Sequence, residues 1–185
     1  MTRPLPSWVV AVLLEDNPLA LNRAVGIVRR RNLAIASVSL GPSTRVGVSR
    51  LTTVVTADPA SVDRMANQLR KMVGVLEVTV TPEADCITRE HALIRVRVSP
   101  AELAGLLDTI ALYQAAVVEE YAHELVLEAT AAPPMLVSLL RALEPFGVLD
   151  VVQSGAIALP RLAANEPAGG RNALPASRVA TAIPA

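Results

Sequence analysis

The chain has 185 residues, of which 52% are hydrophobic and only 2% aromatic, so its core must be packed mainly from aliphatic side chains. Its 17 basic and 17 acidic residues give a formal net charge of zero, which removes the electrostatic basis for strong nucleic-acid binding. The lone Cys86 cannot form an internal disulfide, and no apolar run approaches the roughly 20 residues needed to cross a bilayer. We therefore expect a cytoplasmic protein that binds neither nucleic acid nor a membrane.

The most informative stretch, Val9–Leu40, predicts a strand, a turn, a helix and a second strand. Val9–Leu14 is an uninterrupted apolar run of strand length. The sequence Glu15-Asp16-Asn17-Pro18 ends it with carboxylates and an amide suited to capping a helix, and a proline suited to the first turn. Backbone N–H groups at a helix N-terminus can hold a carboxylate, so this turn is also a candidate small-anion site. The helix then shows one apolar face and a basic C-terminal end: Leu21, Ala24, Val25, Val28 and Arg29-Arg30-Arg31-Asn32.

The rest of the first half completes a βαββαβ pattern. Ala34–Leu40 alternates between apolar and polar residues, and Val48–Val55 is rich in valine and threonine, so both segments predict strands. Asp58-Pro59 is suited to open a helix that Gly74 ends, and a fourth alternating strand follows. This order of elements is that of a ferredoxin-like unit.

The same order recurs after a polar joint at Thr81–Glu90, with helices that begin at Pro100 and Pro134. The sequence therefore predicts an α+β protein of two ferredoxin-like βαββαβ domains, with a first domain at 1–82, a linker at 83–90 and a second domain at 91–162. Residues 163–185 lose periodicity and fill with Ala, Pro and Gly, so we expect a disordered tail there. The predicted strands of the second domain are Ala92–Val98, Ala115–Glu120, Glu124–Ala129 and Val148–Ile157.

Apart from the turn, the sequence offers little support for catalysis. His91 and His123 lie far apart, and neither lies near Cys86 in a ligand-like spacing, so we interpret all three as ordinary structural residues. Glu83 and Asp85 lie in a polar joint that lacks the apolar surroundings needed to separate their pKa values. We therefore expect no enzyme activity, no cofactor and no metal.

Several short motifs in fixed order carry a resemblance to a known family. They are Leu14-Glu15-x-x-Pro18-x-x-Leu21-x-Arg23-x-x-Gly26, Arg31-x-x-x-Ile35-x-Ser37, Arg89-Glu90 before Leu93-Ile94-Arg95-Val96, and Val152-Gln153-Ser154-Gly155. Over residues 8–161 the chain resembles the small regulatory subunit of acetolactate synthase, also called acetohydroxyacid synthase. The resemblance implies an N-terminal ACT domain followed by a C-terminal ACT-like domain.

The resemblance also implies a function and a set of binding residues. Members of this family are non-catalytic regulatory subunits that bind and activate a large, thiamine-diphosphate-dependent catalytic subunit in branched-chain amino-acid biosynthesis. It implies a homodimer in which valine or a related branched-chain amino acid is held between two ACT domains. The effector-binding residues carried over in this way are Asp16, Asn17, Pro18, Leu19, Ala20, Ala34 and Ile35. For the turn, a plain helix cap without a ligand is the other interpretation.

Three of these positions depart from the family's pattern. Asp16 replaces an asparagine, Leu19 replaces a glycine and Ala34 replaces a second asparagine. A carboxylate repels a ligand carboxylate where an amide would donate to it, and an isobutyl group prevents a close approach to the backbone. We therefore expect weakened feedback by amino acids with activation of the partner retained. The alternative function is a free-standing ACT-type amino-acid sensor that acts on a different partner.

Overall fold

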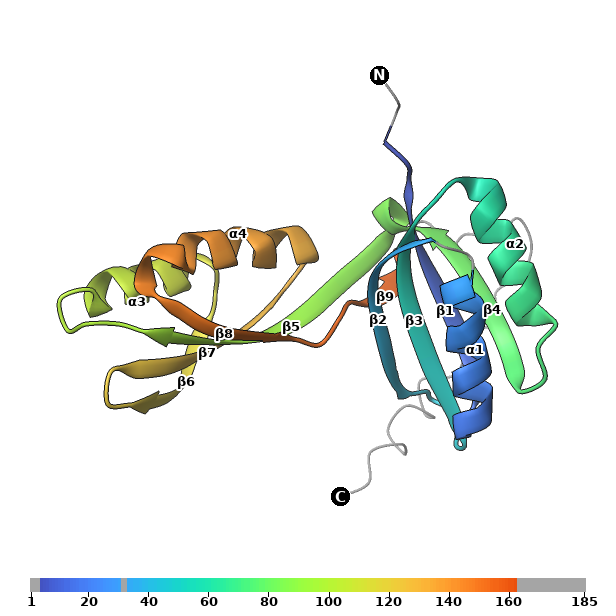
Figure 1. The fold of residues 1–185 in the computed structure, drawn as a ribbon, viewed down its shortest axis with the longest axis horizontal. Coiled ribbons are helices and arrows are strands. Elements are labelled where there is room, and N and C mark those ends of the chain that lie inside the picture. The colour runs from blue at the N-terminus through green and yellow to red at the C-terminus, as the bar shows by residue number, and fades with distance from the viewer. Residues whose placement is uncertain (1–3, 31–32, 163–185) are drawn as a thin grey trace. The chain divides into compact units, whose positions relative to one another are not determined.

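The computed structural model describes residues 4–30 and 33–162, and it divides them into two compact units (Figure 1). The first unit comprises 4–30, 33–87 and 158–162, and the second comprises 88–157. The predicted tail at 163–185, and Arg31 and Asn32 at the end of the first helix, lie outside the described residues.

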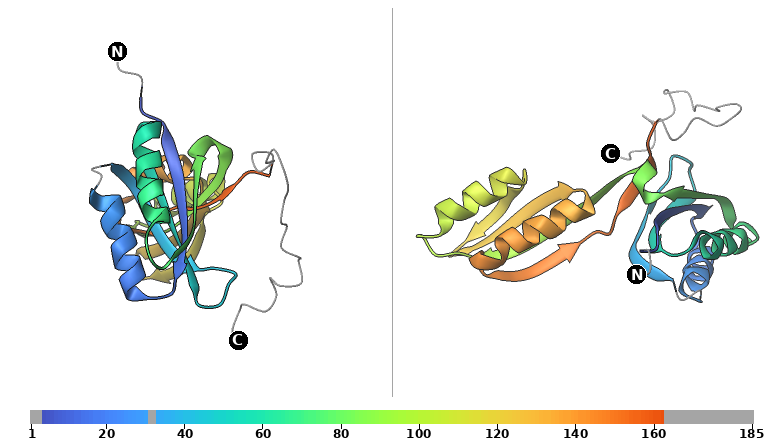
Figure 2. Two further views of the ribbon diagram at one scale, coloured as in Figure 1. Left: turned by 90° about the vertical axis from the view of Figure 1, so that its right-hand side faces the viewer. Right: turned by 90° about the horizontal axis from the view of Figure 1, so that it is seen from above.

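The first unit is a four-stranded antiparallel sheet with both helices on one face (Figures 1 and 2). The strand order is β2-β3-β1-β4, so β1 and β3 are central and β2 and β4 are edges. Its elements are β1 (Ser7–Glu15), α1 (Pro18–Arg30), β2 (Ala34–Pro42), β3 (Val48–Thr56), α2 (Pro59–Arg70), β4 (Val75–Pro82) and the 3-10 turn η1 (Glu83–Asp85).

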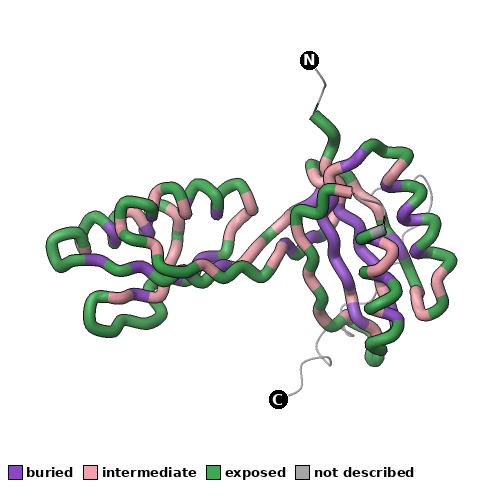
Figure 3. The backbone as a smooth tube through the Cα atoms, viewed as in Figure 1, coloured by how far each residue is buried: buried purple, intermediate pink, exposed green. Residues whose placement is uncertain are grey.

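Burial follows from this arrangement. Most residues of the central strands β1 and β3 are buried, whereas most residues of the edge strand β2 are exposed (Figure 3). The core joins Val10, Val12 and Leu14 of β1 to Met65 and Leu69 of α2. As predicted, Asp58 caps α2, and its Oδ1 accepts a hydrogen bond from the Ser61 N–H at 2.9 Å.

The second unit repeats the same topology with the strand order β6-β7-β5-β8. Its elements are β5 (Cys86–Arg97), α3 (Leu103–Leu112), β6 (Ala116–Tyr121), β7 (Glu124–Ala131), α4 (Pro133–Leu143), η2 (Glu144–Phe146) and β8 (Val148–Gln153). Alternate residues of β5 and β7 point to the helices, and Ile94, Leu127, Leu106 and Leu139 form the centre of its core. Two βαββαβ units are therefore present, as the sequence predicted.

Two segments differ from the predicted elements. Most of the expected polar linker is strand, because β5 begins at Cys86 rather than at Ala92. The expected closing strand is broken: Gly155 has a left-handed φ of 74°, and a separate strand β9 (Ile157–Pro160) follows it and pairs with β5. Arg161 N–H donates to the Asp85 carbonyl at 2.7 Å, so a partner distant in sequence satisfies the backbone of the polar segment.

None of the helices in the described ranges is long and apolar enough to span a membrane.

Candidate functional site

The predicted effector turn lies between β1 and α1, and Asn17 is its capping residue. The Asn17 Oδ1 accepts hydrogen bonds from the Leu19 N–H at 2.8 Å and from the Ala20 N–H at 3.2 Å. Pro18 has no N–H, and the Leu21 N–H donates to the Asn17 carbonyl at 3.2 Å. The expectation of free backbone donors at this helix start is therefore wrong, because the turn uses all of them internally.

Two neighbouring loops hold the turn through its backbone. The Glu15 N–H donates to the Gly74 carbonyl at 2.8 Å, and the Asp16 N–H donates to the Gly47 carbonyl at 2.9 Å. Gly74 has a φ of +88°, and a Cβ built on it would lie 3.0 Å from the Ala20 Cβ. The loop before β4 is therefore packed directly against the start of α1.

The Asp16 side chain is also engaged within the chain. Its Oδ1 accepts a hydrogen bond from the Ser49 Oγ at 2.9 Å, and Ser49 is buried in β3. This contact ties the turn to the strand beside it. Sequence reasoning missed Ser49, because the only local signal is a serine within a strand rich in valine and threonine.

The other residues of the turn differ in exposure. Pro18 and Leu19 are exposed, and 55% of Leu19 remains accessible to solvent. Ala20 is buried in the core of the unit beneath the start of α1. The isobutyl group of Leu19 thus lies on the surface of the turn, where a ligand would approach the backbone.

The remaining predicted site residues, Ala34 and Ile35, lie at the other end of the sheet. Ala34 pairs with Thr56 at the end of β3, whereas Glu15 pairs with Val48 at its beginning. Thr56 lies eight residue steps along β3 from Val48, which corresponds to about 27 Å at roughly 3.4 Å per step. One chain therefore does not bring Ala34 and Ile35 together with the turn.

The strand that carries these residues is an uncharged edge. Every residue of β2 is neutral, and Ile35, Val38 and Leu40 are 42–48% exposed. The register with β3 shifts between Ile35 and Ser37, which marks a β-bulge there. The Ser37 Oγ is buried without a hydrogen-bond partner among the described residues. Exposed, uncharged edge strands are the usual sites of pairing with another chain.

Cys86 and the histidines have structural surroundings. Cys86 is buried, and burial first and the nearby Asp85 and Glu83 carboxylates second raise the pKa of its thiol. A raised pKa keeps the thiol protonated and unreactive. His123 lies in the turn between β6 and β7, where its carbonyl accepts the Val98 N–H at 2.9 Å.

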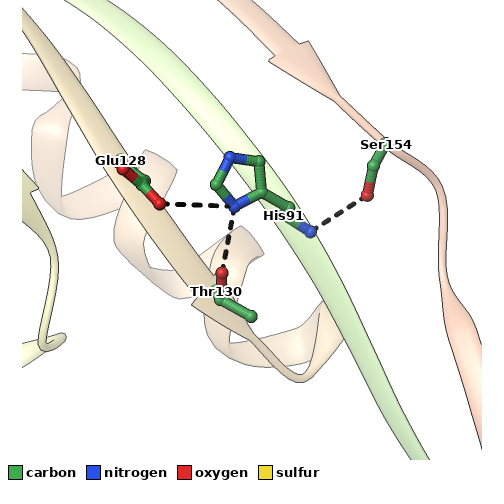
Figure 4. Close-up of polar contacts among 4 residues, drawn as sticks. All are labelled: His91, Glu128, Thr130 and Ser154. Atoms are coloured by element: carbon green, nitrogen blue, oxygen red, sulfur yellow. Dashed lines mark hydrogen bonds and ion pairs between the residues drawn. The ribbon is translucent and has the colours of Figure 1, made fainter. Parts of the chain in front are cut away.

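His91 lies on β5 and contacts β7 through its side chain and the residue that follows β8 through its backbone (Figure 4). Its Nδ1 lies 3.0 Å from the Thr130 Oγ1 and 3.9 Å from the Glu128 Oε1. Its backbone N–H donates to the Ser154 Oγ at 3.1 Å, and the Ser154 N–H donates back to the His91 carbonyl at 2.9 Å. Nowhere in the described ranges do three or more His, Cys, Asp or Glu residues gather as a metal site would need.

Comparison with known proteins identifies both halves of the chain. A family model for the ACT domain of acetohydroxyacid synthase small subunits matches residues 10–77, and one for the small subunit of acetolactate synthase matches 89–162. The acetolactate synthase small subunit of Mycolicibacterium smegmatis is 32% identical over 161 residues, covering 87% of this chain and 95% of that protein. That of Mycobacterium leprae is 34% identical over 157 residues, covering 85% and 93%.

The fold agrees with a solved structure of the same family. The crystal structure of the acetolactate synthase small subunit from Thermotoga maritima has a TM-score of 0.76 at 23% identity, covering 84% of this chain and 97% of that one. The two βαββαβ units, their order and the matches across both of them lead to one conclusion. The chain belongs to the acetolactate synthase small-subunit family.

Proposed function

We propose that this chain is a non-catalytic regulatory subunit that binds and activates a thiamine-diphosphate-dependent acetolactate synthase large subunit. The observation that carries the proposal is that the family matches both domains of the chain, 10–77 and 89–162. Its large partner condenses pyruvate with a second 2-keto acid at the start of branched-chain amino-acid synthesis. The chain contributes a scaffold rather than reacting groups.

We further propose that two copies form a homodimer through β2. Antiparallel pairing of β2 with the same strand of a second copy places the Ala34 end of one beside the Pro42 end of the other. Pro42 pairs with Ser49, which holds Asp16, so this end of the sheet carries the turn. A two-fold axis would place Ala34 and Ile35 of one copy at the end of the sheet that carries the partner's turn, and in this proposal the effector site is completed only between copies.

Feedback by branched-chain amino acids is weakened in this proposal. The Leu19 and Ala20 N–H groups already donate to Asn17, which leaves the NH₂ group of the Asn17 side chain as the donor for a ligand carboxylate. Asp16 adds a like charge, and Ala34 removes a hydrogen-bonding side chain. A loss of roughly 1–3 kcal/mol for each unpaired polar group, or about 4 kcal/mol in total, corresponds to about a thousandfold weaker binding.

Co-purification tests the proposed partner. The chain is expressed with the large subunit from the same organism, and acetolactate formation is measured with and without it. We expect a stable complex and a higher rate in its presence. Absence of both a complex and activation would overturn the assignment and favour a sensor that serves another partner.

Calorimetry with valine tests the regulatory part separately. We expect no binding by the natural chain and partial recovery in the triple variant Asp16→Asn, Leu19→Gly, Ala34→Asn. The matched control is Ser43→Gly, Arg45→Asn, which changes the nearby β2–β3 hairpin without touching the predicted site residues. Tight valine binding by the natural chain that is abolished by Leu19→Arg would contradict the proposed weakening.

A further inference from the structure

The first sheet is buried on both of its faces, although its two helices pack on only one of them. Val10, Val12 and Leu14 of β1 belong to the core beneath α1 and α2. Successive residues of a strand point to opposite faces, so Val9 and Ala11 point away from the helices. Their exposed fractions are nevertheless only 3% and 8%. A part of the chain other than the helices therefore covers this side of the sheet.

Strand β3 shows the same burial on the same side. Thr52 pairs with Ala11, and Val54 pairs with Val9, so these four residues share one face of the sheet. Thr52 and Val54 are buried as well. We call the surface formed by these four residues the helix-free face.

The last described residues of the chain, 158–162, return to this face. They belong to the first unit although they follow the whole second unit in sequence, and β9 lies beside the first sheet (Figures 1 and 2). Arg50 lies two residues before Thr52 in β3, on the same face, and its Nη2 donates to the Ala158 carbonyl at 3.3 Å. The Arg161 N–H donates to the Asp85 carbonyl at 2.7 Å. We define residues 158–162 as the strap.

The strap also lies close to Cys86. This residue is buried at the start of β5, the strand with which β9 pairs. Burial is the largest influence on the pKa of its thiol and raises it, while the Arg50 and Arg161 cations are near enough to lower it. One of these arginines holds the strap and the other belongs to it. The strap and the buried thiol are therefore neighbours.

The contacts that hold the strap are few. Ala158 buries only a methyl group, whereas 63% of Leu159 and 84% of Leu162 are already exposed. The hydrogen bond from Arg50 is longer than the usual range for an N–H donor. Release of the strap therefore leaves the core beneath the helices intact. Segments with few buried apolar contacts open at a lower free energy than the whole domain.

We propose that the strap opens as a local unit while the rest of the first unit stays folded, and that its opening exposes Cys86 and the helix-free face. Residues 88–157 lie between the two segments that form the first unit, 1–87 and 158–162. A docked strap thus anchors the second unit to the first at both of its ends, and an open strap leaves it anchored at one. The strap is a conformational switch built into the fold.

Thiol labelling of the full-length chain tests the proposal, because Cys86 is the only cysteine in the sequence. An aromatic disulfide reagent reacts with the exposed thiolate and releases a coloured thiolate. Labelling rates are measured at several urea concentrations below the unfolding transition, which the fluorescence of Trp8 reports, since Trp8 packs against the core of the first unit. We expect the urea dependence of labelling to be less than about one third of that of global unfolding. Equal dependences would mean that only global unfolding exposes Cys86, and would overturn the proposal.

Two variants of neighbouring residues then identify the strap as the cover. Ala158→Glu places a carboxylate on the buried side of the strap, and the control, Leu159→Glu, makes the same change on its exposed side. Because an unpaired charge does not stay buried, we expect labelling at least about tenfold faster in the first variant and within about twofold of the natural rate in the control. Equal labelling rates in the two variants would show that the strap does not cover Cys86.

Arg50→Ala keeps the test decisive if Ala158→Glu does not fold. It removes the side-chain hydrogen bond to the strap, and we expect labelling about threefold faster or more. The Arg50 cation by itself lowers the pKa of the Cys86 thiol, so the loss of its charge alone would slow the reaction. The two roles of Arg50 thus predict changes of opposite sign. A labelling rate in Arg50→Ala equal to or below that of the natural chain would overturn the proposal.

Discussion

The turn after the first strand of each unit can be compared directly, because the two units repeat one topology. In the first unit the Glu15 N–H donates to the Gly74 carbonyl at 2.8 Å. In the second unit the Arg97 N–H donates to the Gly147 carbonyl at 3.0 Å. Both glycines have a left-handed φ and precede the last strand of their sheet. This contact therefore belongs to the fold and says nothing about a ligand.

The second backbone contact of each turn repeats in the same way. The Asp16 N–H donates to the Gly47 carbonyl in the β2–β3 hairpin, and the Val98 N–H donates to the His123 carbonyl in the β6–β7 hairpin, each at 2.9 Å. What distinguishes the first turn is its side chains, the Asn17 cap and the Asp16–Ser49 hydrogen bond. A candidate effector site is thus marked by side chains on a backbone frame that both units share.

The edges of the two sheets differ more than the turns do. Both edge strands carry a bulge, but β2 contains no charged residue, whereas the corresponding edge β6 contains Glu119 and Glu120. Charged residues on an edge discourage pairing with other chains. This difference in charge supports the proposed association through β2 rather than through β6.

We expect the largest effect from placing a charge on the uncharged edge strand β2. Val38 is the middle residue of β2, so Val38→Glu places two carboxylates close together in the proposed dimer. We expect the dimer dissociation constant to rise at least about a hundredfold, from a loss of about 2.7 kcal/mol. Sedimentation equilibrium measures it, with Val118→Glu on β6 as the control that leaves association unchanged. A dimer that persists in the Val38 variant would show that β2 is not the interface.

A smaller effect tests the glycines that the two turns share. A Cβ at Gly147 would lie 3.1 Å from the Arg97 carbonyl oxygen, and one at Gly74 would lie 3.0 Å from the Ala20 Cβ. With the cost of a left-handed φ added, we expect Gly147→Ala and Gly74→Ala each to lower the free energy of unfolding by about 2 kcal/mol. Urea unfolding measures this. Gly26→Ala is the control, since a Cβ there meets nothing within 4 Å.

The side-chain contact specific to the first turn gives a smaller effect. Ser49→Ala removes the hydroxyl that donates to Asp16. We expect the free energy of unfolding to fall by about 1 kcal/mol and hydrogen exchange at the Asp16 N–H to become faster. Ser138→Ala is the control, because its hydroxyl bonds only the Pro134 carbonyl one turn earlier in α4. Equal stability and unchanged exchange in the Ser49 variant would mean that the contact does not hold the turn.

The smallest effect concerns the hairpins. Ala122 adopts a φ of +52°, where the hairpin of the first unit has Gly47 at +72°. Ala122→Gly relieves the strain of a Cβ in the left-handed region, partly offset by the greater freedom of glycine in the unfolded chain. We expect thermal unfolding to show a free energy of unfolding that is higher by about 0.5 kcal/mol. The opposite substitution in the other hairpin, Gly47→Ala, should lower it by about 1 kcal/mol. A destabilised Ala122→Gly variant would contradict this account.

Local patterns in the sequence determined much of the fold. The apolar run Val9–Leu14 and the capping residues Asp58-Pro59 act through neighbours within a few positions, so their strand and helix start were predicted correctly. The end of that helix was not, because α2 ends at Arg70 and Gly74, with its left-handed φ, lies in the turn before β4. The repeat of the βαββαβ order then followed from the same local signals. The sequence did not identify which residue caps the first helix, because Asp16 and Asn17 both favour that position. In the structure the cap is Asn17.

Tertiary structure decided the features that depend on residues distant in the chain. Most of the segment predicted as a polar linker is part of β5, which pairs with β9. The buried Ser49 donates a hydrogen bond to the Asp16 carboxylate. Register along β3 placed Ala34 at the opposite end of the sheet from the turn. Hydrogen bonds between remote segments and strand register have no signature in local sequence, because each is set by the packing of the whole unit.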